Sequence, residues 1–483
     1  MRGSRLVRAL VALAFAATAC TTDGEDGIGI TQQTPRGRPV RSDTLVIGLV
    51  GTMTGDDAWR GEDAFEGADL AVHRLNVAQD EEEPPFELVT RDDGGSGTQA
   101  LRQIEELVAL PRTVGIIYAG PPEVLPRAED ALARRGVPAM LVYGDLYGAR
   151  RLTPHTFQMA PSLVWEARRI AAYLLDDRRY ETVGVVASKT FTGSVAVESM
   201  QTALEQAGDA RGHVARYDAS LTDLDRAIER LRRARIEAIV VEGPPRVLSL
   251  VTATLREMDA SYVSTARARL ASAGNEVRRR RIASGTWHPQ VLVFDGGMSP
   301  RVEEPLTPGT VASDSYGRGA HYLPVPNFLR FRKSFRAWWG ALPLGWQLRS
   351  YDAVRLLGWA YDQAASGEDL AGVLEGAHAR FGGTEVTLGP DDHTAVDQGA
   401  VGLWVVPAAD RAVPERERLG SETYAELPWV PLARGFSIDG VELDLAAEDW
   451  RYLVKGAPPP QAPAPRITRL KWGITTRRSD PIH

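Results

Sequence analysis

Short apolar runs alternate with longer amphipathic stretches along most of this chain. The apolar runs are rich in Val and Ile, as buried strands are, whereas the longer stretches repeat apolar residues every three or four positions, as helices do. In the first part of the chain, strands are predicted at 45–50, 86–90, 114–118 and 139–142, and helices at 63–77, 98–110 and 125–135. This alternation indicates βαβ units, which build a parallel sheet covered by helices.

A second alternation follows and predicts a second parallel sheet. Helices are expected at 163–176, 194–207, 223–234 and 246–258, and strands at 183–187, 236–241 and 291–294. Two further helices, at 327–339 and 348–365, precede a last strand at 400–406. Residues 259–288 interrupt the pattern, so we interpret them as an insertion. The predicted fold class is therefore α/β, with two parallel sheets in series.

Length and composition agree with more than one folded unit. The chain has 483 residues, whereas a single hydrophobic core stops growing at about 250–300 residues. With 43% hydrophobic and 25% charged residues, the chain is globular in composition and has enough apolar side chains for a sizeable core.

The first 19 residues have the pattern of an export signal. Arg2, Arg5 and Arg8 precede the apolar run at 9–16, and small residues follow up to Ala19. The run is too short for a membrane-spanning helix, which needs about 20 apolar residues. We therefore expect residues 1–19 to be removed as a signal peptide.

Cys20 is the one cysteine in the chain and directly follows Ala17-Thr18-Ala19. This segment resembles the bacterial lipobox, in which the cysteine is lipidated and becomes the new amino terminus, although that motif favours Leu where this chain has Ala17. The alternative is an ordinary cleaved signal followed by an incidental cysteine. Residues 20–42 are rich in Thr, Gly, Asp and Pro, so they are predicted to be a flexible tether.

The charge of the chain argues against nucleic acid as a partner. The formal net charge is −7, and removing residues 1–19, which hold three arginines and no acidic residue, lowers it to about −10. Phosphate backbones require a basic surface. The one strongly basic run, at 278–281, is interpreted as a solvated segment.

No pattern for catalysis, metal binding or a cofactor stands out. Gly48, Gly51 and Gly55 are not spaced as Gly-x-Gly-x-x-Gly, and no Walker-type Gly-Lys-Ser/Thr occurs. The eight histidines include no His-Glu-x-x-His pair. The densest metal-like cluster, Asp391-Asp392-His393, follows Gly389-Pro390 and is predicted to be a turn. We therefore predict that the protein is not an enzyme and holds no metal and no cofactor.

Several short motifs resemble those of one known family. The segment that begins at Val46 continues through a glycine-rich turn, and the later motifs follow in the family's order: Trp59-Arg60-Gly61, Gly67-Ala68-Asp69-Leu70-Ala71, Asp92-Asp93, Phe191-Thr192-Gly193 and Tyr351-Asp352-Ala353. Over about residues 44–406, the chain is similar to the type I periplasmic binding proteins. It most resembles their branched-chain amino-acid-binding subfamily, the solute-binding lipoproteins of ABC transporters.

The resemblance implies two Rossmann-like lobes joined by three crossing segments, with a solute enclosed between them. The implied organisation is a signal peptide at 1–19, a tether at 20–42, lobe 1 at 43–160 plus 298–383, lobe 2 at 161–297 plus 384–440 with the insertion at about 259–288, and a proline-rich tail at 441–483.

Loops after the strands are the place to look for a ligand site, because ligands bind at the carboxyl ends of parallel strands. In amino-acid binders of this family, small and hydroxyl residues of two such loops hold the ligand carboxylate. Here Pro121 and Pro122 have no N–H to donate, and Asp145 would repel a carboxylate. A ligand with a cationic, hydroxylated or ring-bearing part is therefore expected.

The candidate contacts lie on these loops and on the first-lobe turn. Aromatic rings attract cations and other rings, but each of these aromatic residues could instead be a wall or core residue. Asp295 aligns with an acidic residue that holds the ligand ammonium in amino-acid binders; its alternative role is to form a turn before two glycines. Glu242 has a similar placement and less support. The predicted ligand-binding residues are Trp59, Tyr118, Gly120, Tyr143, Asp145, Phe191 and Asp295.

The predicted function is solute capture for an ABC importer. The protein would be lipid-anchored on the extracytoplasmic face of the membrane, with a small-molecule solute and an ABC permease as partners. The alternative is a lipid-anchored receptor or cell-wall regulatory protein that uses the same fold without transport. The insertion and the long tail are features that an importer component does not need.

Overall fold

The computed structural model describes fifteen stretches of the chain. They are residues 44–79, 84–208, 211–218, 220–271, 287–295, 310–314, 326–340, 343, 345–365, 368–382, 385–396, 400–406, 430–431, 436–438 and 441–443. All belong to one compact unit, Pro39–His483. The predicted signal peptide, Cys20, the tether, the basic run and the tail beyond residue 443 lie outside the described residues. Within the described part, no helix combines the length and hydropathy needed to cross a membrane.

The first sheet has five parallel strands in the order β2-β1-β3-β4-β5. The strands are β1 (Leu45–Gly51), β2 (Phe86–Asp92), β3 (Thr113–Ala119), β4 (Ala139–Leu141) and β5 (Thr156–Gln158). Every residue of β1 is buried. Such continuous apolar strands are expected where helices cover both faces of a parallel sheet.

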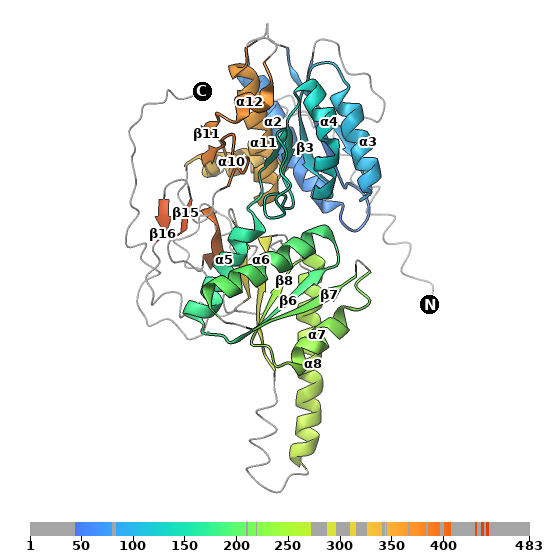
Figure 1. Ribbon diagram of the computed structural model, residues 1–483, viewed down its shortest axis with the longest axis vertical. Coiled ribbons are helices and arrows are strands. Elements are labelled where there is room, and N and C mark those ends of the chain that lie inside the picture. Colours follow the sequence, from blue (N-terminus) through green and yellow to red (C-terminus); the bar gives the residue numbers. More distant parts are fainter. Residues whose placement is uncertain are drawn as a thin grey trace, which may run out of the picture. The chain divides into compact units, whose positions relative to one another are not determined.

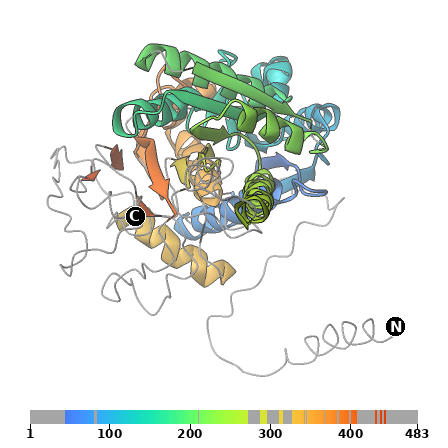
Figure 2. The same ribbon diagram turned by 90° about the horizontal axis from the view of Figure 1, so that it is seen from below.

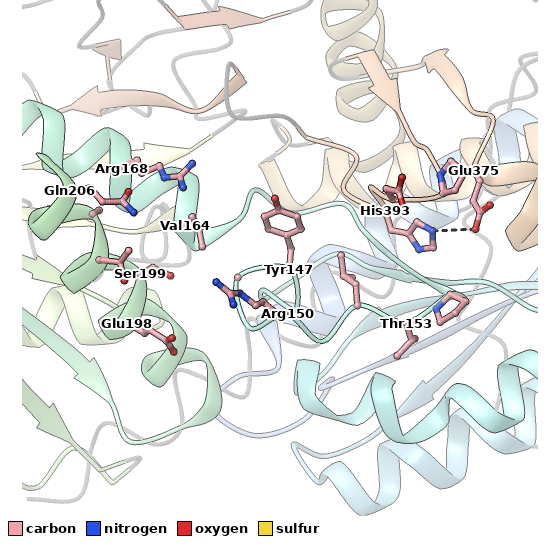
Figure 3. Close-up of a pocket in the computed structure, with 17 residues that line it drawn as sticks. Tyr147, Arg150, Thr153, Val164, Arg168, Glu198, Ser199, Gln206, Glu375 and His393 are labelled. Carbon is pink, nitrogen blue, oxygen red and sulfur yellow. Dashed lines mark ion pairs between the residues drawn. The ribbon is translucent and has the colours of Figure 1, made fainter.

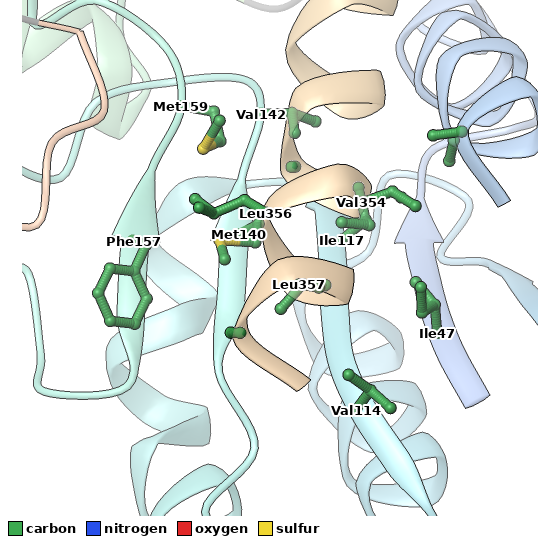
Figure 4. Packing of buried hydrophobic residues seen from close by; sticks show 14 of the residues in the cluster. Ile47, Val114, Ile117, Met140, Val142, Phe157, Met159, Val354, Leu356 and Leu357 are labelled. Carbon is green, nitrogen blue, oxygen red and sulfur yellow. The ribbon is translucent and has the colours of Figure 1, made fainter. Parts of the chain in front are cut away.

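Alternate residues of β1 enter the two cores that flank this sheet. Ile47 and Leu49 pack with α2 (Trp59–Ala78), α11 (Gly345–Gln363) and α12 (Leu370–Leu374), as Figure 4 shows for Ile47 and α11. Val46 and Val50 pack instead with α3 (Gly97–Val108) and α4 (Leu125–Arg135). The period of two along a strand thus determines which helix layer each side chain meets.

The second sheet has seven strands in the order β14-β13-β10-β9-β8-β6-β7. They are β6 (Thr182–Ser188), β7 (Arg211–Tyr217), β8 (Ala238–Val241), β9 (Gln290–Val293), β10 (Val311–Asp314), β13 (Gly402–Val405) and β14 (Val430–Pro431). The strands from β7 to β10 are parallel, whereas β13 and β14 pair antiparallel. The sheet is therefore mixed, because β13 runs antiparallel to β10 after the chain has passed through α10 (Pro326–Trp339), α11 and α12.

Two layers of helices also cover this sheet. One core contains α5 (Leu163–Ala172), a π-helical turn (Tyr173–Asp177) and α6 (Phe191–Ala207). The other contains α7 (Leu224–Arg233), α8 (Pro245–Ala271) and α10. A hairpin of β11 (His378–Arg380) and β12 (Glu385–Thr387), a short 3-10 helix (Pro122–Val124) and the pair β15 (Phe436–Ile438) and β16 (Val441–Leu443) complete the described elements.

Several boundaries differ from those expected. Helix α8 continues to Ala271, so the first half of the expected insertion extends a regular helix, while residues 272–286 lie outside the described part. Strand β10, expected in lobe 1, pairs with β9 and β13 in the second sheet. Conversely, Val386, Leu388 and Ala395, expected in lobe 2, pack in a core of the first sheet. Contacts between residues far apart in the sequence therefore determine to which sheet these segments belong.

Candidate functional site

A small cavity of about 30 Å³ lies where loops from both sheets meet. Its lining comes from the loop after β4, the segment that enters α5, the start of α6 and the loops after β8 and β9. The lining residues are Tyr143, Gly144, Ala160, Pro161, Leu163, Glu166, Thr192, Glu242, Gly243, Phe294 and Asp295. This is the carboxyl edge of the parallel strands, where ligands of open α/β sheets bind.

Glu242 directly follows β8 and is 8% exposed. Its Oε2 accepts hydrogen bonds from the backbone N–H (2.9 Å) and the hydroxyl (3.0 Å) of Ser188, at the end of β6. Burial raises the pKa of Glu242, whereas the bonds from Ser188 and the charge of Arg60 act in the opposite direction. The carboxyl group is thus held rigidly at the cavity wall by the neighbouring strand.

Asp295, two residues after the end of β9, forms an ion pair within the protein. Arg349 of α11 donates to both of its carboxylate oxygens, at 2.6 and 2.9 Å, and Arg349 is completely buried. The backbone N–H of Asp295 donates to Glu166 (2.8 Å), which also accepts from the Ser313 hydroxyl (2.5 Å). The negative charge of Asp295 is therefore neutralised before any ligand arrives.

An aromatic cluster stands beside the cavity. The rings of Trp59 and Tyr143 meet edge to face at 5.5 Å, and Trp59 lies 4.5 Å from Trp346. The guanidinium of Arg60 lies 4.2 Å from the centre of the Tyr143 ring and 3.7 Å from Asp57. Burial raises the pKa of Tyr143 to about 12, so its hydroxyl keeps its proton. Burial opposes the charge of Arg60, but Tyr143 and nearby carboxylates outweigh it and raise the pKa of Arg60.

Two predicted contacts have structural roles instead. Tyr118 is completely buried in the core beside α3 and α4, and its hydroxyl donates to the carbonyl of Pro121 at 2.9 Å. Asp145 is 1% exposed. Its carboxylate accepts four hydrogen bonds of 2.8 to 3.0 Å, from Gly148 N, Gln158 Nε2, Ser162 Oγ and Leu163 N. Because these bonds use both oxygens, Asp145 holds the loop after β4 to the start of α5.

Gly120 and Phe191 also lie away from the cavity lining. A Cβ at Gly120 would overlap Asp93 Oδ2 and the Tyr118 hydroxyl, so glycine is needed there for a close approach of the backbone. Phe191 begins α6 and packs against cores of both sheets, with the guanidinium of Arg151 5.4 Å from its ring centre. Among the predicted contacts, Tyr143 and Asp295 line the cavity and Trp59 supports Tyr143.

The Asp391-Asp392-His393 cluster does not gather metal ligands. Asp392 accepts a hydrogen bond from the N–H of Thr394 (2.9 Å), and His393 stacks on Phe157 with ring centres 4.3 Å apart. In the described part of the chain, no group of three or more His, Cys, Asp or Glu side chains is arranged to hold a metal ion. The segment is therefore a turn packed on the first sheet.

Comparison with known proteins identifies this architecture. Residues 44–279 match the family model described as periplasmic binding protein. A solved periplasmic binding protein type 1 from Bordetella pertussis Tohama I is 20% identical, with a TM-score of 0.62 over 76% of this chain and 98% of that chain. The chain has the type I periplasmic binding protein fold.

Other solved structures with this fold are similarly distant in sequence. The branched-chain amino acid transporter substrate binding protein LivJ from Streptococcus pneumoniae, solved with isoleucine, is 16% identical over 75% of this chain and 95% of that chain, with a TM-score of 0.59. A solute binding protein of an ABC transporter from Rhodopseudomonas palustris BisB5, solved with 3,4-dihydroxy benzoic acid, is also 16% identical (76% and 94% covered, TM-score 0.60). No curated protein sequence matches the chain significantly.

These comparisons confirm the expected resemblance and fold class. The similar proteins are named as binding proteins or transporter components and not as enzymes. Within this periplasmic binding protein fold, the sequence interpretation missed Arg349, which neutralises Asp295, and Arg60, which lies over Tyr143. Both stand in or beside motifs that carried the resemblance, Trp59-Arg60-Gly61 and Tyr351-Asp352-Ala353, so an arginine near the start of each helix was the available signal.

Proposed function

We propose that this chain is an extracytoplasmic solute-binding lipoprotein of an ABC importer. The observation that carries this proposal is the cavity at the carboxyl edges of both sheets, because loops of the two sheets contribute Tyr143 on one side and Glu242 and Asp295 on the other. The cavity of about 30 Å³ has room for about one water molecule, so a solute requires the surrounding loops to open. Once held there, the solute would contact both sheets at once. Binding would therefore favour a closed arrangement that a permease can recognise.

The charges around the cavity support a small polar ligand with a cationic group. After Arg349 has neutralised Asp295, Glu242 remains as the acidic group at the wall, and a cationic ligand beside it would favour its ionised form. Tyr143 and Phe294 present aromatic side chains beside it, and such rings attract cations. Asp145 does not act on the ligand, since both of its oxygens accept hydrogen bonds within the protein. The proposed contacts are Tyr143, Glu242 and Asp295, with Trp59 behind Tyr143.

The names of the similar structures favour import over the receptor alternative, because two of them describe transporter proteins. Their ligands differ in charge: isoleucine has an ammonium group and 3,4-dihydroxy benzoic acid has none. Neither ligand is therefore assigned to this chain.

Thermal denaturation of the full-length protein in mild detergent tests ligand binding. The panel holds amino acids, polyamines, quaternary amines, sugars, nucleosides and aromatic acids. A ligand at about 100 times its Kd should raise stability by about 2.7 kcal/mol. Glu242→Gln should abolish the shift, whereas Glu205→Gln, an exposed residue of α6 away from the cavity, should keep it. Absence of a shift with every class would contradict solute capture.

Fractionation of cells tests the lipid anchor. The wild-type protein should sediment with membranes and its amino-terminal peptide should carry a lipidated Cys20, whereas Cys20→Ser should release the protein into the soluble fraction. Recovery of the wild-type protein in the soluble fraction would contradict the proposed anchor. Copurification with a permease after crosslinking would separate import from the receptor alternative.

A further inference from the structure

A second and larger pocket shares no lining residue with the cavity at the strand ends. Its volume is about 670 Å³, within the range of about 300–1,000 Å³ that is typical of small-molecule sites. The loop 147–154, helices α5 and α6, and residues 375 and 390–393 form its walls (Figure 3). Elements of both sheets therefore border it.

Two arginines of this pocket have guanidinium groups available for a ligand. Arg168 stands on α5 and Arg150 on the loop after β4, and both are exposed. Within the described residues, neither side chain has a hydrogen-bond or ion-pair partner. Figure 3 shows both around a common space with Tyr147 and Ser199. Arg150 also has a left-handed backbone, with φ of 54°, a conformation that costs energy for a side chain of this size and often marks functional positions.

The opposite wall contributes a hydroxyl that opens onto the pocket. Ser199 lines the pocket and is only 6% exposed, yet among the described residues its hydroxyl makes no hydrogen bond. Its Oγ keeps contact with solvent in the pocket, so a ligand there can form a hydrogen bond with it. Thr202 and Gln206 lie on the same face of α6, since residues three and seven positions apart share a face. This wall therefore presents hydrogen-bond donors to the same space that the two arginines border.

The acidic residues of the pocket limit what it can bind. Glu375 is engaged by His393 at 3.4 Å, at the end away from the arginines (Figure 3), where Asp391 also lines the pocket. Glu198 of α6 also lines the pocket and offsets part of the charge of Arg150 and Arg168. The net field at the arginine end therefore favours an anion of low charge over a polyanion.

We propose that this pocket is a second ligand site, which binds a small organic anion through Arg150, Arg168 and the hydroxyl of Ser199. Carboxylates and phosphates share this chemistry, because both accept paired hydrogen bonds from a guanidinium group. The site is separate from the cavity near Glu242 and does not depend on which solute that cavity binds.

Isothermal titration calorimetry on the full-length protein in mild detergent, at low salt, tests this site with inorganic phosphate and succinate as probes. Wild-type protein should bind at least one probe, and preference for phosphate or succinate distinguishes phosphorylated from carboxylate ligands. Arg150→Ala with Arg168→Ala should weaken binding at least tenfold. Ser199→Ala should weaken it several-fold.

A matched control keeps the test specific. Arg134→Ala with Arg135→Ala removes the same charge from exposed positions of α4 outside the pocket and should leave affinity unchanged. Glu198→Gln should strengthen binding, which a general loss of structure would not do. Thermal denaturation would verify that each variant folds. Failure of both probes to bind, or equal weakening in the control and the pocket variants, would overturn the proposal.

Discussion

The ion pair between Arg349 and Asp295 shows how one residue changes the chemistry of a whole cavity. By sequence, Asp295 is a free acid after a strand; in the fold, a guanidinium from a distant helix takes both of its oxygens. A buried ion pair adds little net stability, but removing one partner leaves an uncompensated charge. Arg349 thus determines whether Asp295 can serve a ligand.

Arg349→Met should therefore destabilise the protein. We expect the free energy of unfolding to fall by about 3–5 kcal/mol, because the Asp295 carboxylate is left buried without its partner. Adding Asp295→Asn should restore part of the loss. Urea denaturation measures both. Arg134→Met, at an exposed site of α4, should stay within about 0.5 kcal/mol of the wild type, and a similarly small effect of Arg349→Met would refute this account.

At the scale of elements, the contact between α2 and α11 brings the first-lobe turn and the late helix together. The helices lie side by side (Figures 1 and 2) although they are far apart in sequence. Gly67 permits this approach, since a Cβ there would overlap the carbonyl of Gln347 and the hydroxyl of Ser350. The same contact places Trp59, at the start of α2, against Trp346, at the start of α11.

Gly67→Ala should separate the two helices and lower the free energy of unfolding. The expected loss is about 1–3 kcal/mol, the usual cost of overpacking a tight contact. Gly372→Ala in α12 is the matched control, because nothing lies within 4 Å of its added Cβ and alanine stabilises a helix by about 0.5–1 kcal/mol relative to glycine. If urea denaturation gave the same change in the free energy of unfolding for both variants, the close contact at Gly67 would not contribute to stability as proposed.

At the scale of the whole molecule, packing of the two sheets pairs opposite charges and buries carboxyl groups. Besides Arg349 and Asp295, Arg246 of α8 pairs with Asp56 of the turn after β1. Burial raises the pKa of Asp93, Asp145 and Glu242. Folding therefore makes these carboxyls bind their protons more tightly than the unfolded chain does.

Stability should consequently fall as pH rises above the ordinary carboxyl pKa of about 4. The sign follows because a group whose pKa is raised by folding binds more protons in the native state, and that advantage is lost as pH passes through the raised pKa. Melting temperatures measured between pH 5 and 8 should decline. Glu242→Gln should flatten the decline and the exposed Glu205→Gln should not. Identical profiles for the wild type and Glu242→Gln would contradict the contribution of Glu242.

The order of the elements and the fold class follow from the sequence pattern. The predicted strands and helices from β1 through α7 recur with small changes in their ends, because apolar periodicity records which face of each element is buried. Apolar periodicity did not predict the short or edge strands. Strand β5 has only three residues, and β7 mixes Arg211, His213 and Arg216 with apolar residues. Their pairing comes from neighbours and not from their own pattern.

Which polar residues are available to a ligand depends on how distant elements pack together. Tyr118 and Asp145 lie close to strand ends, as the proposed contacts Tyr143 and Glu242 do, but hydrogen bonds within the protein use them. Arg349 meets Asp295, and Arg150 and Arg168 reach one pocket, only because distant elements pack together. A sequence records local periodicity, whereas the partner of a buried charge depends on long-range packing, so the chemistry of the site follows from the fold.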